Sequence, residues 1–278
     1  MYNLPINFIC CPFINLFVYL MPPIQNFLKA DFILGQLIDH FKDRPFFTRV
    51  ELFDFYHQFE PDLKKTAFEG RVYHLRAKKL ISSVDRKRFS LSYKPRFTPV
   101  LEPRQKDVFS KVEKQFPDVN CCIWSTKWMN EFMLHQPGRF INVLEVGDEA
   151  AETVFHFLQD NNIRNLFFQP GAKEIENYIS ENFDSVVVKS LVTKAPLEIA
   201  SNTRIPSIEK ILVDIFADKV LYMVFQGSEL SFIFNSVYQK YEINFTKLFH
   251  YAKRRGKSEE LSAFLRTNTD IPKNVLND

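Results

Sequence analysis

Glycine is scarce in this sequence, and its scarcity excludes several classes of enzyme. Only seven glycines occur among 278 residues, and none of them forms the phosphate-binding loop of a P-loop or dinucleotide-binding protein. The nucleophile elbow of α/β-hydrolases is also missing. The six histidines show no metal-ligand spacing. The sequence therefore predicts no catalytic residues, no metal and no cofactor.

Cysteine is equally limited. The four cysteines form two adjacent pairs, Cys10-Cys11 and Cys121-Cys122. Adjacent cysteines are poor disulfide partners, and neither pair has the two-residue gap of a zinc knuckle. We expect Cys121 and Cys122 to lie in a buried strand and the protein to work in the reducing cytoplasm.

Long apolar runs are confined to the N-terminus. The stretch Phe8–Leu20 is apolar but contains Pro12 and Asn15, and the first basic residue is Lys29. A signal peptide carries positive charge before its apolar core, and a membrane span needs about 20 apolar residues. We therefore expect residues 1–26 to be a non-globular extension, produced by a misassigned start, and no membrane contact. A membrane anchor is the alternative.

Positive charge is concentrated in one part of the chain. Residues 44–106 hold fifteen Lys or Arg and seven Asp or Glu, an excess of +8. Because the whole chain carries +3, the remainder carries −5. A local basic excess of this kind is typical of a nucleic-acid-binding module.

The same region has the pattern of a winged helix-turn-helix. Apolar residues recur at helical spacing over residues 27–41. Thr48 and Glu51 form a capping-box sequence that opens a second helix, and a third helix is expected over 62–79. Short strands over 80–84 and 89–93 would form a hairpin. We assign residues 27–98 to this DNA-binding domain and place the boundary in the proline-rich segment up to Pro103.

The third helix and the hairpin supply the candidate DNA contacts. Phe68, Val72 and Leu75 would face the core, which leaves Thr66, Gly70 and Tyr73 on the opposite face. Basic flanks suit phosphates, and the outer face suits base edges in the major groove. The candidate DNA-binding residues are Lys64, Lys65, Thr66, Arg71, Tyr73, Arg76, Lys78 and the hairpin tip Arg86, Lys87 and Arg88. A role in protein contacts only is the alternative.

The remaining chain, residues 107–270, has a different pattern. Expected strands over 119–125, 140–146, 165–169 and 185–191 alternate with expected helices over 107–116, 127–134, 148–160 and 173–182. This alternation predicts a mixed sheet with some parallel pairing. From Pro206 onward the pattern is helical, with segments near 207–217, 229–240, 244–255 and 258–267. The fold class is therefore α+β: a winged helix-turn-helix, then a mixed α/β domain that ends in a helical region.

Two alternatives belong to other functional classes. Glu145 at a strand end, together with Glu174 or Glu176, could form the carboxylate set of a metal-dependent nuclease. The lysine that such a site would have two positions after Glu145 is missing. The α/β domain could instead sense a small ligand for a transcriptional regulator. Neither alternative has a complete motif.

Two short segments carry a family resemblance. Pro206 to Asp214 reads P-x-x-E-K-x-L-V-D, and Leu248 to Gly256 reads L-x-x-Y-A-x-R-R-G. On a helix, Lys210 and Asp214 lie one turn apart and can pair. With the preceding winged helix and α/β region, these segments resemble the AbiEi family of antitoxins from type IV (abortive infection) toxin-antitoxin systems. The resemblance implies an antitoxin, not an enzyme, that represses its own promoter at inverted repeats. It also implies that the antitoxin counters a nucleotidyltransferase-like toxin as a monomer or weak dimer.

Overall fold

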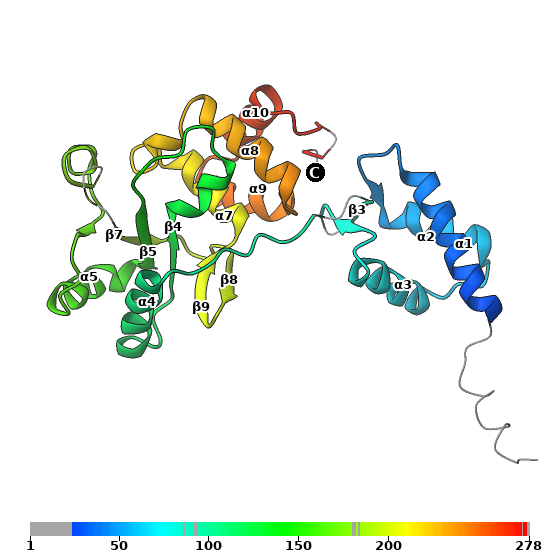
Figure 1. Cartoon of the computed structure of the whole chain (residues 1–278), viewed down its shortest axis with the longest axis horizontal. Coiled ribbons are helices and arrows are strands. Elements are labelled where there is room, and N and C mark those ends of the chain that lie inside the picture. The colour runs from blue at the N-terminus through cyan, green and yellow to red at the C-terminus, as the bar shows by residue number, and fades with distance from the viewer. Residues whose placement is uncertain are drawn as a thin grey trace, which may run out of the picture.

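The computed structural model describes residues 24–85, 87–91, 94–179, 182, 184–273 and 275–276, with only the backbone given for 24–32. Residues 1–23 lie outside this set, so the expected extension is not described. Helix α1 already begins at Ile24, three residues before the expected domain start. The fold is a mixture of helices and small sheets (Figure 1).

The first unit of the chain combines helices with a short three-stranded sheet. Its elements are α1 (Ile24–Phe41), β1 (Phe47–Thr48), α2 (Arg49–Phe59), α3 (Lys65–Ala77), β2 (Ser82–Ser83) and β3 (Arg88–Ser90). Strand β3 lies between β1 and β2 and is antiparallel to both. The capping box expected at Thr48 and Glu51 is confirmed, because each residue bonds the backbone N–H of the other. Strand β1 was not expected, since two residues carry no visible period.

Aromatic residues build the core of this unit. Leu37, Phe41, Phe47 and Leu52 are fully buried, and the rings of Phe41 and Phe47 stack with centroids 4.0 Å apart. Large aromatic side chains bury much apolar area per residue. The unit therefore has its own hydrophobic core.

An extended segment, residues 94–102, leads from β3 to the larger body (Figure 1). The Glu242 backbone N–H donates to the Pro95 carbonyl at 2.9 Å. The Lys94 ammonium lies 3.8 Å from the centre of the Tyr238 ring and donates to the Tyr238 carbonyl. Helix α4 (Pro103–Gln115) begins four residues before its expected start, because Glu102 and Gln105 form a capping box and Pro103 suits the first turn.

A four-stranded sheet organises the larger body. Its strands are β4 (Cys121–Ser125), β5 (Ile141–Gly147), β6 (Leu166–Phe168) and β7 (Ser185–Leu191), in the order β4-β5-β7-β6. Strand β7 pairs in parallel with both β5 and β6, and β4 is antiparallel to β5. The expected strands and the partly parallel pairing are confirmed.

The helices between these strands include short irregular turns. Helix α5 (Ala151–Asp160) follows a 3-10 turn, η3 (Asp148–Ala150). Residues expected as a helix over 127–134 form the 3-10 helix η2 (Thr126–Phe132). The expected helix over 173–182 is a short α6 (Ala172–Glu174) continued by the π-helix η4 (Ile175–Ile179).

Alternate side chains of the sheet enter two different cores. Val186 and Val188 pack with the α4 and α5 side of the sheet, whereas Val187 packs on the opposite side with the C-terminal helices. Cys121 and Cys122 lie in β4 and are buried, as expected. Burial raises the pKa of the Cys121 thiol to about 11. Because the sheet is buried on both faces, most residues of its strands are apolar.

A hairpin precedes the helical region and was not expected. Strands β8 (Leu197–Ala200) and β9 (Thr203–Pro206) are antiparallel, and the two residues between them, Ser201 and Asn202, both have positive φ. Two-residue turns of this kind fit the twist of a hairpin. The helices expected after it are present as α7 (Ile208–Ala217), α8 (Ser228–Lys240), α9 (Phe245–Arg254) and α10 (Ser258–Asn268), with the 3-10 turn η5 (Met223–Phe225) before α8. Among the described residues, no helix is both long and apolar enough to cross a membrane.

Candidate nucleic-acid interface

Helix α3 presents one face to the core and the other to the surface. Phe68, Val72 and Leu75 are buried, as their spacing predicted. On the opposite side Tyr73 is 70% exposed, and Thr66 and Gly70 are exposed as well. A Cβ atom added at Gly70 would meet nothing within 4 Å. The outer face of α3 is therefore open.

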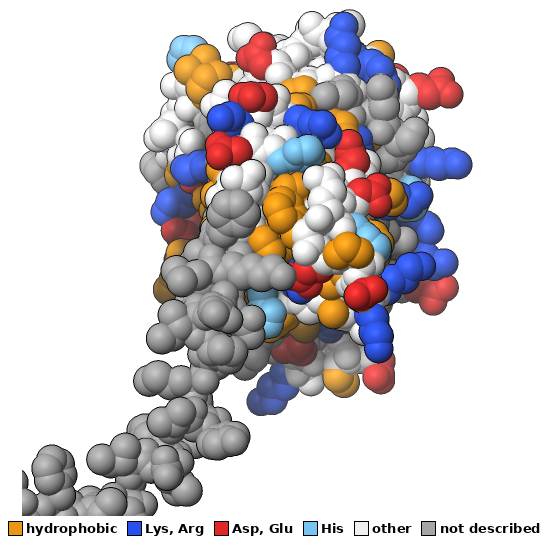
Figure 2. All heavy atoms as spheres, turned by 90° about the vertical axis from the view of Figure 1, so that its right-hand side faces the viewer, with side chains coloured by type: hydrophobic (Ala, Val, Ile, Leu, Met, Phe, Trp, Pro, Cys, Tyr) orange, Lys and Arg blue, Asp and Glu red, His pale blue; other side chains and the backbone are white. Residues whose placement is uncertain are grey.

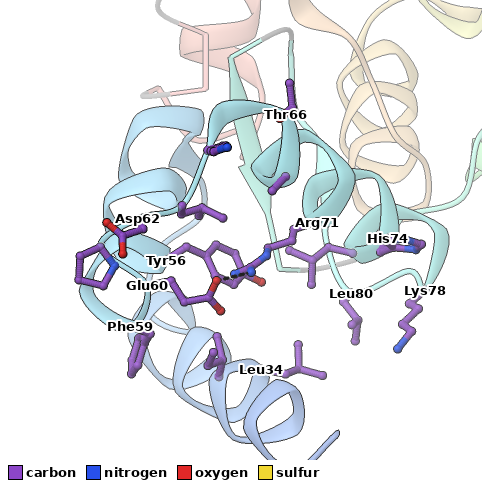
Figure 3. Close-up of a pocket in the computed structure, with 16 residues that line it drawn as sticks. Leu34, Tyr56, Phe59, Glu60, Asp62, Thr66, Arg71, His74, Lys78 and Leu80 are labelled. Carbon is purple, nitrogen blue, oxygen red and sulfur yellow. Dashed lines mark hydrogen bonds and ion pairs between the residues drawn. The ribbon is translucent and has the colours of Figure 1, made fainter. Parts of the chain in front are cut away.

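Two ion pairs fix α3 against α2. Arg49 at the start of α2 pairs with Glu69, and Arg71 pairs with Glu60 just after α2. The Arg71 guanidinium also lies 5.0 Å from the centre of the Tyr56 ring. Figure 3 shows Arg71 pointing from α3 toward Glu60 and Tyr56. Arg71 therefore positions α3, and its charge is largely matched within the protein.

A pocket of about 950 Å³ lies beside α3 and is also lined by α1 and the end of α2. Leu34 and Phe59 line it from the α1 and α2 side, and Thr66, His74 and Lys78 line it from α3 (Figure 3). The hollow has apolar walls together with cationic and acidic groups at its edge. The pocket adds to the surface that a partner could contact beside Lys78.

Most expected cations of α3 are exposed. Lys64, Lys65, Arg76 and Lys78 are exposed, and the structure gives the three lysine side chains no hydrogen bond or ion pair with the residues it describes. Arg76 acts on a carboxyl in the larger body: burial raises the pKa of Glu242, while Arg96 and Arg76 oppose this shift. Lys64, Lys65 and Lys78 are the cations of α3 left available to a partner.

The view onto the N-terminal unit shows how the charge is distributed. Lys and Arg side chains gather along the right-hand edge, while exposed apolar side chains lie near the centre (Figure 2). Carboxylates are interspersed among both. The positive surface is therefore a border and does not cover the whole face.

The hairpin between β2 and β3 differs from the expected basic tip. Arg86 lies outside the described residues, and Lys87 is exposed. The Arg88 side chain is only 12% exposed and pairs with Asp85. Its guanidinium lies 4.8 Å from the Phe46 ring centre and donates to the Val275 carbonyl at 3.3 Å. Arg88 therefore does not belong to an exposed tip; it joins the hairpin to the C-terminal segment, which lies near β3 in Figure 1.

The larger body contains a buried charged network that the sequence only partly predicted. The Lys210 ammonium on α7 lies 2.5 Å from a carboxylate oxygen of Asp214 and 2.5 Å from one of Glu145. The Tyr251 hydroxyl donates to Asp214 at 2.9 Å, and the Arg255 guanidinium lies 3.4 Å from the same carboxylate. The pairing of Lys210 with Asp214 was expected from their helical spacing. Glu145 was considered only as a nuclease residue, and nothing in the sequence connects it with Lys210.

Electrostatics keep the Lys210 ammonium charged. Burial disfavours the charged ammonium, but Asp214 and Glu145 outweigh that cost and raise the pKa of Lys210 well above its ordinary value. Burial and the nearby Asp214 also raise the pKa of Tyr251, so its hydroxyl remains a donor. The network joins β5, α7 and α9. Lys210, Glu145 and Asp214 are almost completely buried, which suits a structural role.

Metal ligation finds no support among the described residues, where no group of three or more His, Cys, Asp or Glu could hold an ion. The two segments that carry the family resemblance meet at Asp214, which comes from one of them, while Tyr251 and Arg255 come from the other.

Comparison with known proteins gives a family without an assigned activity. No curated protein matches the sequence. The family described as "Family of unknown function (DUF6577)" matches residues 67–271, from the first turn of α3 to just beyond α10. This match covers more than half of the chain. The chain therefore belongs to the DUF6577 family.

Proposed function

We propose that residues 24–91 form a winged helix-turn-helix that binds duplex DNA through α3, and that the chain is a transcriptional regulator. The resemblance to AbiEi antitoxins extends this proposal. The chain would repress its own promoter in the cytoplasm and counter a nucleotidyltransferase-like toxin.

The observation that carries the proposal is the open, cationic outer side of α3. Lys64 and Lys65 at its start and Lys78 at its end are exposed, and Tyr73 projects from the outer face beside an unobstructed Gly70. The element order supports it, since α2 and α3 are joined by the short segment 60–64 and a hairpin follows. In such a module the second helix of the motif enters the major groove.

The side chains of α3 have distinct roles in this proposal. The three lysines contact phosphates, while Thr66 and Tyr73 face base edges. Arg71 holds α3 against Glu60, so we assign it to positioning. We leave Arg88 out of the contact set because the C-terminal segment occupies its guanidinium.

Salt-dependent DNA binding tests this assignment. Fluorescence anisotropy would follow the binding of a duplex from the gene's own upstream region over a salt series. The slope of log K against log salt is negative. In the variant K64A/K65A/K78A, the loss of three phosphate contacts makes this slope less steep by about 2.7, or about 0.9 for each contact. Affinity at low salt falls as well.

A matched variant separates position from total charge. Lys106, Lys114 and Lys173 are exposed lysines of the larger body, so K106A/K114A/K173A removes the same charge elsewhere. We expect this variant to keep the wild-type slope. Equal slopes in the wild type and K64A/K65A/K78A would refute the role of α3.

The antitoxin part of the proposal needs a cellular test. A toxin gene next to this one would be expressed with and without the chain, and colony growth would be scored. Rescue that persists in K64A/K65A/K78A would place toxin neutralisation outside the DNA-binding unit. Toxicity unaffected by the wild-type chain would refute the antitoxin role and leave the DNA-binding result intact.

A further inference from the structure

The larger body has a cationic pocket that the proposed DNA-binding surface does not include. A cavity of about 310 Å³ lies between α9 and the loop that joins β7 to β8. Its lining includes the basic side chains Lys194, Lys247, His250 and Arg254. An ion pair of 3.6 Å between Lys247 and Glu198 connects α9 with β8 at this place.

The basic residues come from two opposing elements. Lys247, His250 and Arg254 follow helical spacing along α9, so they share one side of the helix. Lys194 stands on the opposing loop, where its positive φ of 56° fixes a tight turn. The Arg254 guanidinium lies 3.4 Å from the Thr193 carbonyl and joins the helix to this loop. The pocket is thus a junction of two elements.

The charges in the pocket are not equally available. Lys247 pairs with Glu198 and, at 3.2 Å, with Glu209, so its charge is matched. Lys194 and Arg254 are exposed, and neither pairs with a carboxylate of the described residues. These two cations are left to attract an anion.

The start of α9 already holds a carboxylate. Glu209 accepts from the Asn244 backbone N–H at 3.0 Å and pairs with Lys247, and the Asn244 side chain accepts from the Lys247 N–H. The attraction for an anion therefore comes from Lys194 and Arg254 on the two opposing elements. A guanidinium and an ammonium beside one small polar cavity are suited to a phosphate group.

We propose that this pocket binds the phosphate group of a ligand. The inference does not depend on the proposed DNA binding, because it rests on α9 and the loop between β7 and β8. The cavity volume is at the lower end of small-molecule sites, which run from about 300 to 1,000 Å³. The phosphate can come from a free nucleotide or from a nucleic-acid backbone, and competition distinguishes these two sources.

Calorimetry with inorganic pyrophosphate at constant ionic strength tests the proposal. We expect the full-length chain to bind pyrophosphate and the variant K194N/R254Q to bind it at least about tenfold more weakly, equivalent to 1.4 kcal/mol. Asn is chosen at position 194 because it tolerates positive φ. The control K253Q changes an exposed neighbour that does not line the pocket, and we expect it to keep the wild-type affinity.

Competition then identifies the source of the phosphate. Displacement of pyrophosphate by ATP, but not by a short DNA duplex, indicates a nucleotide; the reverse indicates a nucleic-acid backbone. If the wild type binds no pyrophosphate, or K194N/R254Q binds it as well as the wild type does, the proposal is wrong. Neither result bears on the α3 variants, so failure of this pocket and failure of the DNA-binding unit are distinguishable.

Discussion

Lysines at two helices of this molecule lie in opposite environments, one exposed to solvent and the other buried. At the two ends of α3, Lys64, Lys65 and Lys78 are exposed. On α7, Lys210 is fully buried between two carboxylates. An exposed ammonium contributes little to folding and remains available to a partner. A buried, paired ammonium is required for stability, because removing either partner leaves an uncompensated buried charge. The comparison separates residues that can serve binding from residues that maintain structure, and stability measurements can test it.

The largest effect is expected at Lys210. Replacing Lys210 with Met leaves Glu145 buried without its cation and leaves Asp214 with Arg255 alone, so the free energy of unfolding should fall by about 3–5 kcal/mol. Urea denaturation followed by circular dichroism measures this loss. As a control, Lys42→Met removes an exposed ion pair with Asp39 and should cost less than about 1 kcal/mol.

A second variant keeps this prediction falsifiable if the first fails to fold. The double variant K210M/E145Q removes one of the stranded charges and should recover part of the stability lost in Lys210→Met. A loss no larger for Lys210→Met than for Lys42→Met would contradict the contrast between buried and exposed lysines.

A smaller effect is expected at Tyr251. Tyr251→Phe removes the hydroxyl that donates to Asp214, and a hydrogen bond to a charged group contributes about 1.5–3 kcal/mol. Tyr222 supplies the matched control: its hydroxyl is buried without a hydrogen-bond partner among the described residues. Tyr222→Phe should therefore cost little. Equal losses for the two variants would show that packing, and not the bond to Asp214, sets the value.

Breaking the capping box of α2 should lower the free energy of unfolding by an intermediate amount that depends on pH. Thr48→Ala should cost about 1 kcal/mol near neutral pH. Hydrogen bonds from Thr48 and the charge of Arg44 lower the pKa of Glu51 in the folded chain. A lowered folded pKa stabilises the protein above the unfolded pKa of about 4.5, and this contribution is lost as pH falls through the folded value.

Urea denaturation at pH 6 and pH 3 checks both parts of this prediction. The difference between wild type and Thr48→Ala should become smaller as the pH falls from 6 to 3, because a falling pH progressively protonates Glu51. Thr66→Ala is the control, since Thr66 is exposed on α3 and caps no helix. A difference that stays constant with pH would exclude a contribution from the Glu51 charge.

The smallest effect is expected on α3 itself. The variant K64A/K65A/K78A should change the free energy of unfolding by no more than about 0.5 kcal/mol, as is usual for exposed positions. Thermal and urea denaturation measure this value beside the DNA-binding assay. A loss of several kcal/mol would mean that these lysines stabilise the fold, and a change in DNA affinity could no longer be assigned to contact.

Local sequence signals predicted the elements that depend on local chemistry. The capping box at Thr48, the inner face of α3 and strand β7 are present as expected. The two-residue strand β1 has no period to detect, and it forms because β3 supplies its hydrogen bonds. Among the interactions of Lys210, the contact one turn away with Asp214 was visible in the sequence. The contact with Glu145, 65 residues away, depends on how the chain folds.

The candidate site shows the same limit. Helical spacing placed Thr66, Gly70 and Tyr73 on the outer face of α3. It could not show that Arg71 is paired with Glu60, because Glu60 lies outside α3, just after α2. Nor could it show that Arg88 contacts the Val275 carbonyl, 187 residues further along the chain. Exposure can be read from a pattern, whereas a long-range partner cannot.

The position of β7 between β5 and β6 constrains the order in which the newly made chain can fold. The first unit has its own core, so it can form as soon as it leaves the ribosome. The larger body must wait, because β7 completes the sheet only after β6 has been made. Until α7 brings Lys210, the carboxylate of Glu145 has no cation to match it in the interior. Docking of α7 is therefore a late step of synthesis, and a truncated chain that ends before residue 210 would lack the helices that cover the Val143 and Val187 face of the sheet.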